Sequence, residues 1–301
     1  MSASRGEIRC RSRTSLLTGV AGLACAYWLP GAAAVCPPLR FVLGVRNRLD
    51  ADDRVLLTFD DGPHAQGTPA VLDLLRAADV QATFFLAGKQ VERRPQLAAE
   101  IASAGHEVAL HCYRHRCLLR LTPGQVHDDL RRAQAVIAEA TGQLPRRYRP
   151  PYGIFNAAAV ALARAYEWEL LLWTKDGRDW QRRATPDSVA AHATRGLRRG
   201  DVVLLHDADH YSAPGSWRRT VAALPRILDA IKTLRAPEQA EFRSRLEQLD
   251  RDYEGRGAER DTAARVRQKL ARTIRPVDDE RARLRALWKL PGLDSNQQPS
   301  G

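Results

Sequence analysis

The sequence contains few cysteines, and their arrangement argues against a fold that depends on them. Among 301 residues there are five cysteines, no C-x-x-C pair is present, and three of the five lie in the first 36 residues. An odd number with this spacing does not suit a disulfide framework. A single bridge between Cys112 and Cys117, formed in an oxidising compartment, stays open as an alternative.

The sequence also lacks the signatures of nucleic-acid binding. The formal net charge is +12, but the basic residues are spread along the chain and no zinc-finger or helix-turn-helix signal is present. We therefore predict no nucleic-acid partner. The positive charge favours other anionic surfaces, namely phospholipid or acidic cell-wall polymers.

Charged residues are missing from residues 14–39. This run follows a cluster of four arginines, and its apolar centre reads LLTGVAGLACAYWLPGAAAV. A basic flank before such a run is typical of an export signal or a membrane anchor, and GAAA before Val35 is a candidate cleavage site. Residues 1–40 are predicted to form this segment, so that the domain is exported to the bacterial cell envelope, either membrane-anchored or secreted. The alternative is a buried helix that packs on the domain.

Short apolar runs alternate with helical patterns from Arg54 onward. Strands are predicted at residues 55–59, 82–86, 107–110, 147–149, 170–173 and 202–205. Several of the helical segments between them begin with Thr-Pro and end in Gly, which are common helix start and stop signals. This alternation predicts an α/β fold with a parallel sheet, open or closed into a barrel, in a domain of residues 54–236. Residues 237–301, rich in Arg, Glu and Asp, predict a charged helical or disordered tail.

Chemically active side chains follow five of the six predicted strands. In parallel α/β folds the functional site forms where the strands end. These side chains are Asp60 and Asp61, His111 and His115 in HCYRH, Arg149 and Tyr152 in RPPYG, Asp176, Asp179 and Trp180 in KDGRDW, and His206 in LLHD. Because residues scattered at random would not recur directly after successive strands, we predict one site at this end of the sheet.

The histidine pair indicates a metal site. His111 and His115 are four residues apart, and in a helical turn this spacing puts both imidazoles on one face. Together with one carboxylate they form a two-His, one-carboxylate set that leaves positions open for water and substrate. The pattern thus assigns one of Asp60 and Asp61 to the metal and leaves the other for proton transfer.

These motifs, in this order, resemble a known family. TFDDGP, H-x-x-x-H, R-x-P-Y, D-x-x-D-W and L-x-H occur in the same sequence in polysaccharide deacetylases with the NodB homology domain, the carbohydrate esterase family 4. The resemblance covers residues 54–231. It implies a distorted (β/α) barrel and metal-dependent removal of N- or O-acetyl groups from a polysaccharide such as peptidoglycan, chitin or xylan.

The resemblance also implies catalytic roles for single residues. It makes Asp60 the general base and Arg149 its ion-pair partner. It makes His206 the general acid, with Asp179 orienting the imidazole. Tyr152 would supply a backbone N–H to the oxyanion.

The same comparison of motifs implies the metal ligands and the substrate pocket. Asp61, His111 and His115 would bind a divalent metal, with Zn²⁺ expected and Co²⁺ as the substitute. Trp180 and Leu204 would line the acetyl pocket.

Two further features bear on the site. The family pattern has Ser or Thr after the first histidine of its second motif, whereas this chain has Cys112. We expect this position to support the loop, so that activity survives the change. The loop of residues 207–217, after His206, contains Tyr211 and Trp217 and is expected to contact sugar.

The sequence leaves the substrate open. A catalytically silent glycan-binding protein on the same scaffold is one alternative, but it would not need the complete set of motif residues. A metal-dependent amidase that acts on a non-sugar C–N bond is another, because fold and site do not fix the substrate. The expected partner is an acetylated glycan, with contact to membrane or anionic cell wall, and the oligomeric state is left open.

Overall fold

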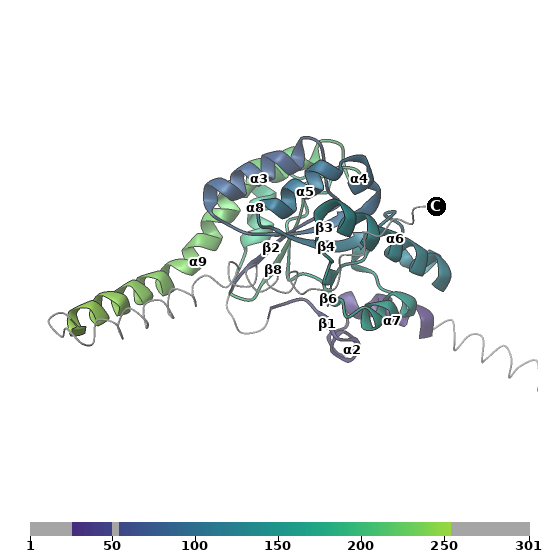
Figure 1. Ribbon diagram of the computed structural model, residues 1–301, viewed down its shortest axis with the longest axis horizontal. Helices are drawn as coiled ribbons and strands as arrows, with labels where there is room; N and C mark the ends of the chain where they lie inside the picture. The colour runs from purple at the N-terminus through teal and green to yellow at the C-terminus, as the bar shows by residue number, and fades with distance from the viewer. Residues whose placement is uncertain (1–25, 50–53, 254–301) are drawn as a thin grey trace, which may run out of the picture. The chain divides into compact units, whose positions relative to one another are not determined.

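The computed structural model describes residues 26–49 and 54–253, with side chains up to residue 234 (Figure 1). Two units are distinguished, Met1–Leu234 and Arg235–Gly301. All strands and nearly all helices lie in the first unit, which carries the functional site. The described part of the second unit is the continuation of one helix, α9 (Ser216–Tyr253).

The first unit is built on an eight-stranded sheet in which every neighbouring pair is parallel. The order is β1-β6-β5-β4-β3-β2-β8-β7. The bounds are β1 Val45–Arg46, β2 Leu56–Asp60, β3 Thr83–Ala87, β4 Glu107–Cys112, β5 Arg147–Tyr148, β6 Glu169–Leu171, β7 Lys175–Asp176 and β8 Val202–His206. With β1 and β7 at its two ends, the curled sheet is an open form of the (β/α) barrel, which confirms the predicted distorted barrel.

Alternation along the strands divides the apolar side chains between two cores. Phe84 and Leu86 of β3 join the large core between the sheet and its helices, whereas Phe85 joins a small second core. The second core also contains Ala109 and Leu171, from β4 and β6. Successive side chains of a strand point to opposite faces, so one face packs on helices and the other lines the concave side of the sheet.

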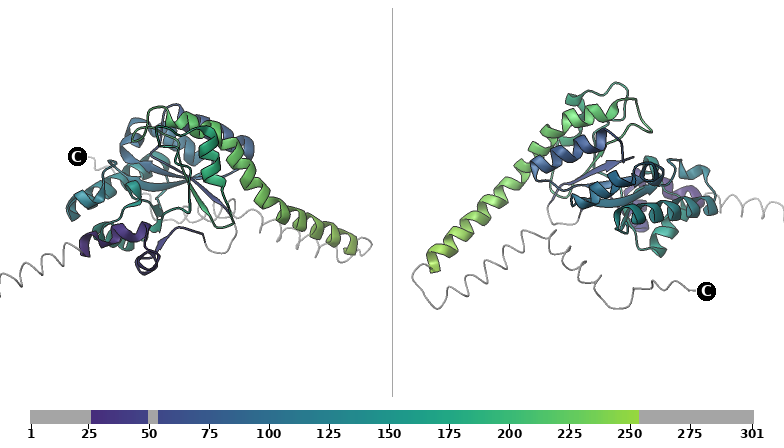
Figure 2. Two further views of the ribbon diagram at one scale, coloured as in Figure 1. Left: turned by 180° about the vertical axis from the view of Figure 1, so that it is seen from behind. Right: turned by 45° about the horizontal axis from the view of Figure 1, so that its top comes forward.

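Helices cover the outer face of the sheet (Figures 1 and 2). They are α3 Gly67–Ala78, α4 Gly88–Arg93, α5 Pro95–Ser103, α6 Pro123–Thr141, α7 Ala157–Ala165 and α8 Pro186–Thr194. The Thr-Pro signals are confirmed at two of them, because Thr122 and Thr185 form capping boxes at the starts of α6 and α8. Each threonine hydroxyl accepts a backbone N–H that the first helical turn leaves free.

All six predicted strands are present, but several short elements escaped prediction, among them β1, β7 and α4. β1 and β7 have two residues each, and α4 has six. Such lengths are too short to display either an alternating or a helical period. The residues after β1 contact the residue before β8, because Arg48 forms an antiparallel bridge and a 2.6 Å ion pair with Asp201.

Part of the predicted signal or anchor segment is folded against the first unit. Residues 29–34 form a 3₁₀ helix, η1 (Leu29–Ala34), and α2 (Pro37–Leu43) follows it. The Tyr27 hydroxyl donates to the Leu121 carbonyl at 2.6 Å, and Ala33 is fully buried. Cleavage before Val35 would therefore remove side chains that the unit binds. In the described stretches, no helix has the length and apolar character needed to cross a membrane.

The predicted tail falls largely beyond the described structure. The boundary expected after residue 236 lies inside α9, which runs without a break from Ser216 to Tyr253. Leu224, Ile227 and Leu228 in the first half of this helix are buried in the main core. Residues 254–301 and residues 1–25 lie outside the described residues.

Candidate active site

The two adjacent aspartates lie where β2 ends. Asp60 is the last residue of the strand, and Asp61 follows it with a left-handed backbone, φ 77°. Asp tolerates this conformation better than most residues other than glycine. Both carboxylates are buried. Two buried, neighbouring carboxylates require cationic partners, and the structure places different partners beside each of them.

Arg149 is the cationic partner of Asp60. Its Nη1 donates to Asp60 Oδ1 at 2.7 Å and to the Thr58 hydroxyl at 2.8 Å. Its Nε and Nη2 donate to the carbonyls of Leu171 and Leu172, each at 3.1 Å. The guanidinium is fully buried, so this planar group joins β2 to the end of β6 and fixes one oxygen of Asp60.

Asp61 lies between two histidines. Its Oδ1 is 3.3 Å from His111 Nε2 and 3.5 Å from His115 Nε2. The three ligand atoms lie within 4.8 Å of one another. The His111 Nδ1–H donates to the Arg149 carbonyl at 2.7 Å, which leaves the Nε2 lone pair directed at Asp61. Asp61 Oδ1 and His111 Nε2 are buried without a hydrogen-bond partner, as expected of atoms that bind a cation.

The two histidines do not share a helical turn, so that expectation is wrong. His111 lies in β4, and residues 113–116 form an irregular loop that contains His115. Asp129 of α6 holds this loop, because its Oδ2 accepts the Tyr113 N–H at 2.8 Å. No sequence signal pointed to Asp129. Cys112 is buried beneath the loop as a free thiol, and Cys117 is also free, so the alternative bridge between them is not formed.

The electrostatics of the three candidate ligands suit a cation. Burial by itself would raise the pKa of Asp61, but the close imidazoles of His111, His206 and His115 hold it well below its usual range. Burial lowers the pKa of His115 to about 4. At neutral pH the site therefore offers one ionised carboxylate and a neutral His115 imidazole with a free lone pair.

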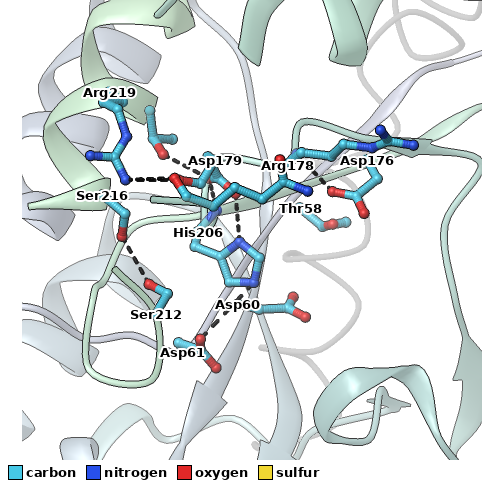
Figure 3. A network of polar contacts seen from close by, with 12 residues as sticks. Thr58, Asp60, Asp61, Asp176, Arg178, Asp179, His206, Ser212, Ser216 and Arg219 are labelled. Atoms are coloured by element: carbon cyan, nitrogen blue, oxygen red, sulfur yellow. Dashed lines mark hydrogen bonds and ion pairs between the residues drawn. The ribbon is translucent and has the colours of Figure 1, made fainter. Parts of the chain in front are cut away.

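His206 faces this cluster from the end of β8 (Figure 3). Its Nδ1 is 2.8 Å from Asp179 Oδ1, and its Nε2 is 4.0 Å from Asp61 Oδ2. Although burial lowers the pKa of His206, the carboxylates of Asp179, Asp61 and Asp60 raise it to about 10. Thr220 of α9 donates to Asp179 Oδ2 at 2.7 Å, a support that the sequence did not indicate. The Nε2–H of a charged imidazole thus points toward the site.

Comparison with known proteins agrees with this geometry. The polysaccharide deacetylase family model matches residues 48–171. A chitooligosaccharide deacetylase from Bradyrhizobium sp. (strain ANU 289) is 38% identical, over 59% of this chain and 84% of the relative. A peptidoglycan-N-acetylglucosamine deacetylase from Bacillus cereus is 34% identical, over 59% of this chain and 81% of the relative.

A solved structure extends the similarity to the fold. The family 4 carbohydrate esterase from Streptomyces lividans, in complex with acetate, is 34% identical with a TM-score of 0.54, and the match covers 60% of this chain and 89% of that one. The chain belongs to the polysaccharide deacetylase family. It is a polysaccharide deacetylase of that family, whose members are typically metal-dependent, and the expected resemblance is confirmed.

Of the remaining predicted residues of the deacetylase, Tyr152 contacts the cluster. Tyr152 has a left-handed backbone, φ 62°, which is rare for a bulky residue and typical of functional sites. Its ring meets the His115 ring edge-on at 4.7 Å. Leu204 is buried in β8, and Trp180 is partly exposed in the loop after β7, where its carbonyl accepts the Ala213 N–H.

Tyr211 is the member of the 207–217 loop that reaches the cluster. Its ring stacks on the His115 ring with centroids 4.4 Å apart and planes 12° apart. Gln90 Nε2 donates to the Tyr211 hydroxyl at 3.0 Å, and burial raises the pKa of this tyrosine to about 12. His115 is therefore in contact with the rings of both Tyr211 and Tyr152. The spacing between motifs gave no sign of this contact.

Trp217, at the start of α9, contacts His64 instead of the candidate metal ligands. The two rings are 5.5 Å apart. The His64 Nδ1 accepts the Gly67 N–H at 2.9 Å, so this histidine caps the start of α3. Its Nε2 lies 3.4 Å from Asp209.

Proposed function

We propose that the deacetylase removes the N-acetyl group from N-acetylglucosamine units of a cell-wall or chitin-like glycan. The observation that carries this proposal is the juxtaposition of three elements: the Asp61–His111–His115 cluster, the Asp60–Arg149 pair and the His206–Asp179 pair. The two relatives named above, which act on chitooligosaccharide and on peptidoglycan N-acetylglucosamine, support this class of substrate.

Asp61, His111 and His115 would hold the divalent cation. The donor set of one carboxylate and two imidazoles suits Zn²⁺, and Co²⁺ would substitute for it. When bound, such a cation acidifies a water molecule and polarises the acetyl carbonyl. The orphaned atoms Asp61 Oδ1 and His111 Nε2 would find their missing partner in this ion.

Asp60 and His206 would move the protons. Arg149 occupies Asp60 Oδ1, so Oδ2 is the oxygen free to accept a proton from the attacking water. His206 is charged at neutral pH and would donate its Nε2 proton to the departing sugar nitrogen. Asp179 accepts the other ring N–H, which fixes the tautomer and orientation of the imidazole.

Tyr152 and two apolar side chains would receive the acetyl group. The left-handed backbone at Tyr152 presents its N–H in the turn after β5, where the developing oxyanion would find a donor. Leu204 and Trp180 would line the acetyl pocket. We further place the enzyme outside the cytoplasmic membrane, because its substrate class lies there and basic residues precede the apolar run at residues 14–39.

We expect acetate release to depend on a divalent metal. Purified deacetylase would be assayed on chitooligosaccharide, peptidoglycan and acetyl-xylan, first as isolated, then after chelation, then after addition of Zn²⁺ or Co²⁺. Chelation should abolish release and either metal should restore it, because three protein ligands leave positions open for water and substrate. Undiminished release from chelated, metal-free protein would disprove the assignment, and glycan binding without release would favour the silent alternative.

We expect Tyr211→Ala to weaken metal binding about tenfold, because groups that orient a ligating histidine contribute on this scale. Tyr211→Phe keeps the stacked ring and loses only the hydroxyl contact with Gln90, so its metal affinity should stay close to that of the wild type. Metal affinity would be measured by competition with a chromophoric chelator.

Tyr166→Ala is the matched control for this experiment. Tyr166 stacks on Trp168 at the end of α7 and does not belong to the cluster. Its removal should leave metal affinity unchanged. If Tyr211→Ala binds metal as tightly as Tyr166→Ala does, Tyr211 has no role in positioning His115.

A further inference from the structure

Apolar side chains exposed to solvent gather near the beginning of the described chain. Eight large hydrophobic residues are exposed among the described residues, and five of them fall within residues 28–42. These five are Trp28, Leu29, Val35, Phe41 and Val42, and we refer to them as the N-terminal apolar surface. Scattered exposed hydrophobic residues are ordinary, but a concentration of this kind marks an interaction site.

The two short helices of this segment are apolar on both sides. In η1, Pro30 and Ala33 are buried three residues apart, while Leu29 and Val35 face solvent. In α2, Leu43 packs on the core, whereas Phe41 is 87% exposed and Val42 71% exposed. A surface helix normally places polar residues on its outer side.

Specific hydrogen bonds fix the segment on the domain. Asn156 Nδ2 donates to the Tyr27 hydroxyl at 2.8 Å, and Trp28 Nε1 donates to the Leu119 carbonyl at 3.2 Å. Arg40 Nη1 reaches the Ala34 carbonyl at 3.4 Å and thereby ties α2 to η1. The outward side chains are therefore held in position on the folded unit.

The charged residue of this segment is basic. Within residues 26–43 Arg40 is the one charged residue, whereas Arg46 and Arg48, which follow, pair with Glu169 and Asp201. Arg120 and Trp28 line the same pocket beside the segment. If a second copy of this chain bound to the N-terminal apolar surface, it would bring the same positive charge. An anionic bilayer offers opposite charge together with an apolar interior. Tryptophan at such a position is typical of membrane–water interfaces.

We infer that the N-terminal apolar surface docks in the interface of an anionic lipid bilayer. Trp28, Leu29, Phe41 and Val42 enter the boundary between head groups and acyl chains, and Arg40 and Arg120 remain at the level of the phosphates. The folded unit itself thus contacts the membrane, independently of residues 1–25 and of the activity at the strand ends.

The test is flotation of the full chain with vesicles of phosphatidylcholine, with and without an equal part of phosphatidylglycerol. We expect binding to the anionic vesicles, and about tenfold weaker binding for Phe41→Ser combined with Val42→Ser, because burial of apolar area drives insertion. Leu144→Ser is the matched control, since Leu144 is 71% exposed, as Val42 is, but lies elsewhere. It should bind as the wild type does, and all variants should release acetate from soluble chitooligosaccharide equally.

A photoactivatable phospholipid distinguishes this surface from residues 1–25. Lipid adducts should map to residues 28–42 in the wild type and be lost there in the double variant. Adducts confined to residues 1–25, or equal binding of the double variant and the wild type, would overturn the inference. A concentration-dependent dimer that the double substitution abolishes, without vesicle binding, would show a second copy as the occupant instead.

Discussion

Asp60→Asn should reduce the rate of acetate release by a factor of about 10²–10⁴, the usual contribution of a general base. The amide keeps the shape of the side chain and can still accept the hydrogen bond from Arg149. It cannot take a proton from water. Because Asp60 is not one of the candidate metal ligands, the metal content per protein should stay at the wild-type level.

Asp61→Ala separates the roles of the two neighbours. It removes one of three candidate ligands, so bound metal and rate should fall together. Asp73→Asn on α3 is the surface control, because Asp73 is exposed and pairs only with Arg76 there. Metal content and acetate release would be measured in parallel for all variants. Loss of metal in Asp60→Asn with retention in Asp61→Ala would show that the two roles are reversed.

The sequence predicted the strand ends well because strong periodic signals and chemical signals coincide there. β2 and β8 are buried apolar runs that end in charged residues, and a parallel sheet brings their ends together. The same reasoning placed Asp60, Asp61 and His206 in one site. The family resemblance supplied the division of roles among them, which remains a proposal.

Contacts made by side chains far apart in sequence could not be predicted in this way. Asp129 holds the loop before His115 from a helix surface, and Thr220 supports Asp179 from α9. Tyr211 reaches His115 from a loop without periodicity. Each of these residues looks ordinary in the sequence, because its function depends on the packing of one element against another. The helical turn expected for the histidine pair failed for a related reason, since the spacing of two residues does not reveal that β4 extends through the first of them.

Arg149→Met should destabilise the fold by roughly 3–5 kcal/mol, the usual cost of breaking a buried ion pair from one side. The guanidinium is fully buried and lies 4.0 Å from the centre of the Phe85 ring. Methionine fills part of the volume but donates none of its hydrogen bonds. The carboxylate of Asp60 would then remain buried without its cation.

Arg147→Met is the matched control, because Arg147 lies in β5, two residues before Arg149, and pairs with Glu107 and Glu169 nearer to solvent. The loss of stability should be smaller, since these ion pairs are only partly buried and water screens them more than it screens the Asp60–Arg149 pair. The free energy of unfolding would be measured in urea for both variants and for Arg149→Met combined with Asp60→Asn. The double variant carries no buried charge at this position, so it should be more stable than Arg149→Met alone. If it is no more stable, the loss comes from packing and from the hydrogen bonds to Thr58, Leu171 and Leu172, and the uncompensated charge of Asp60 is not the cause.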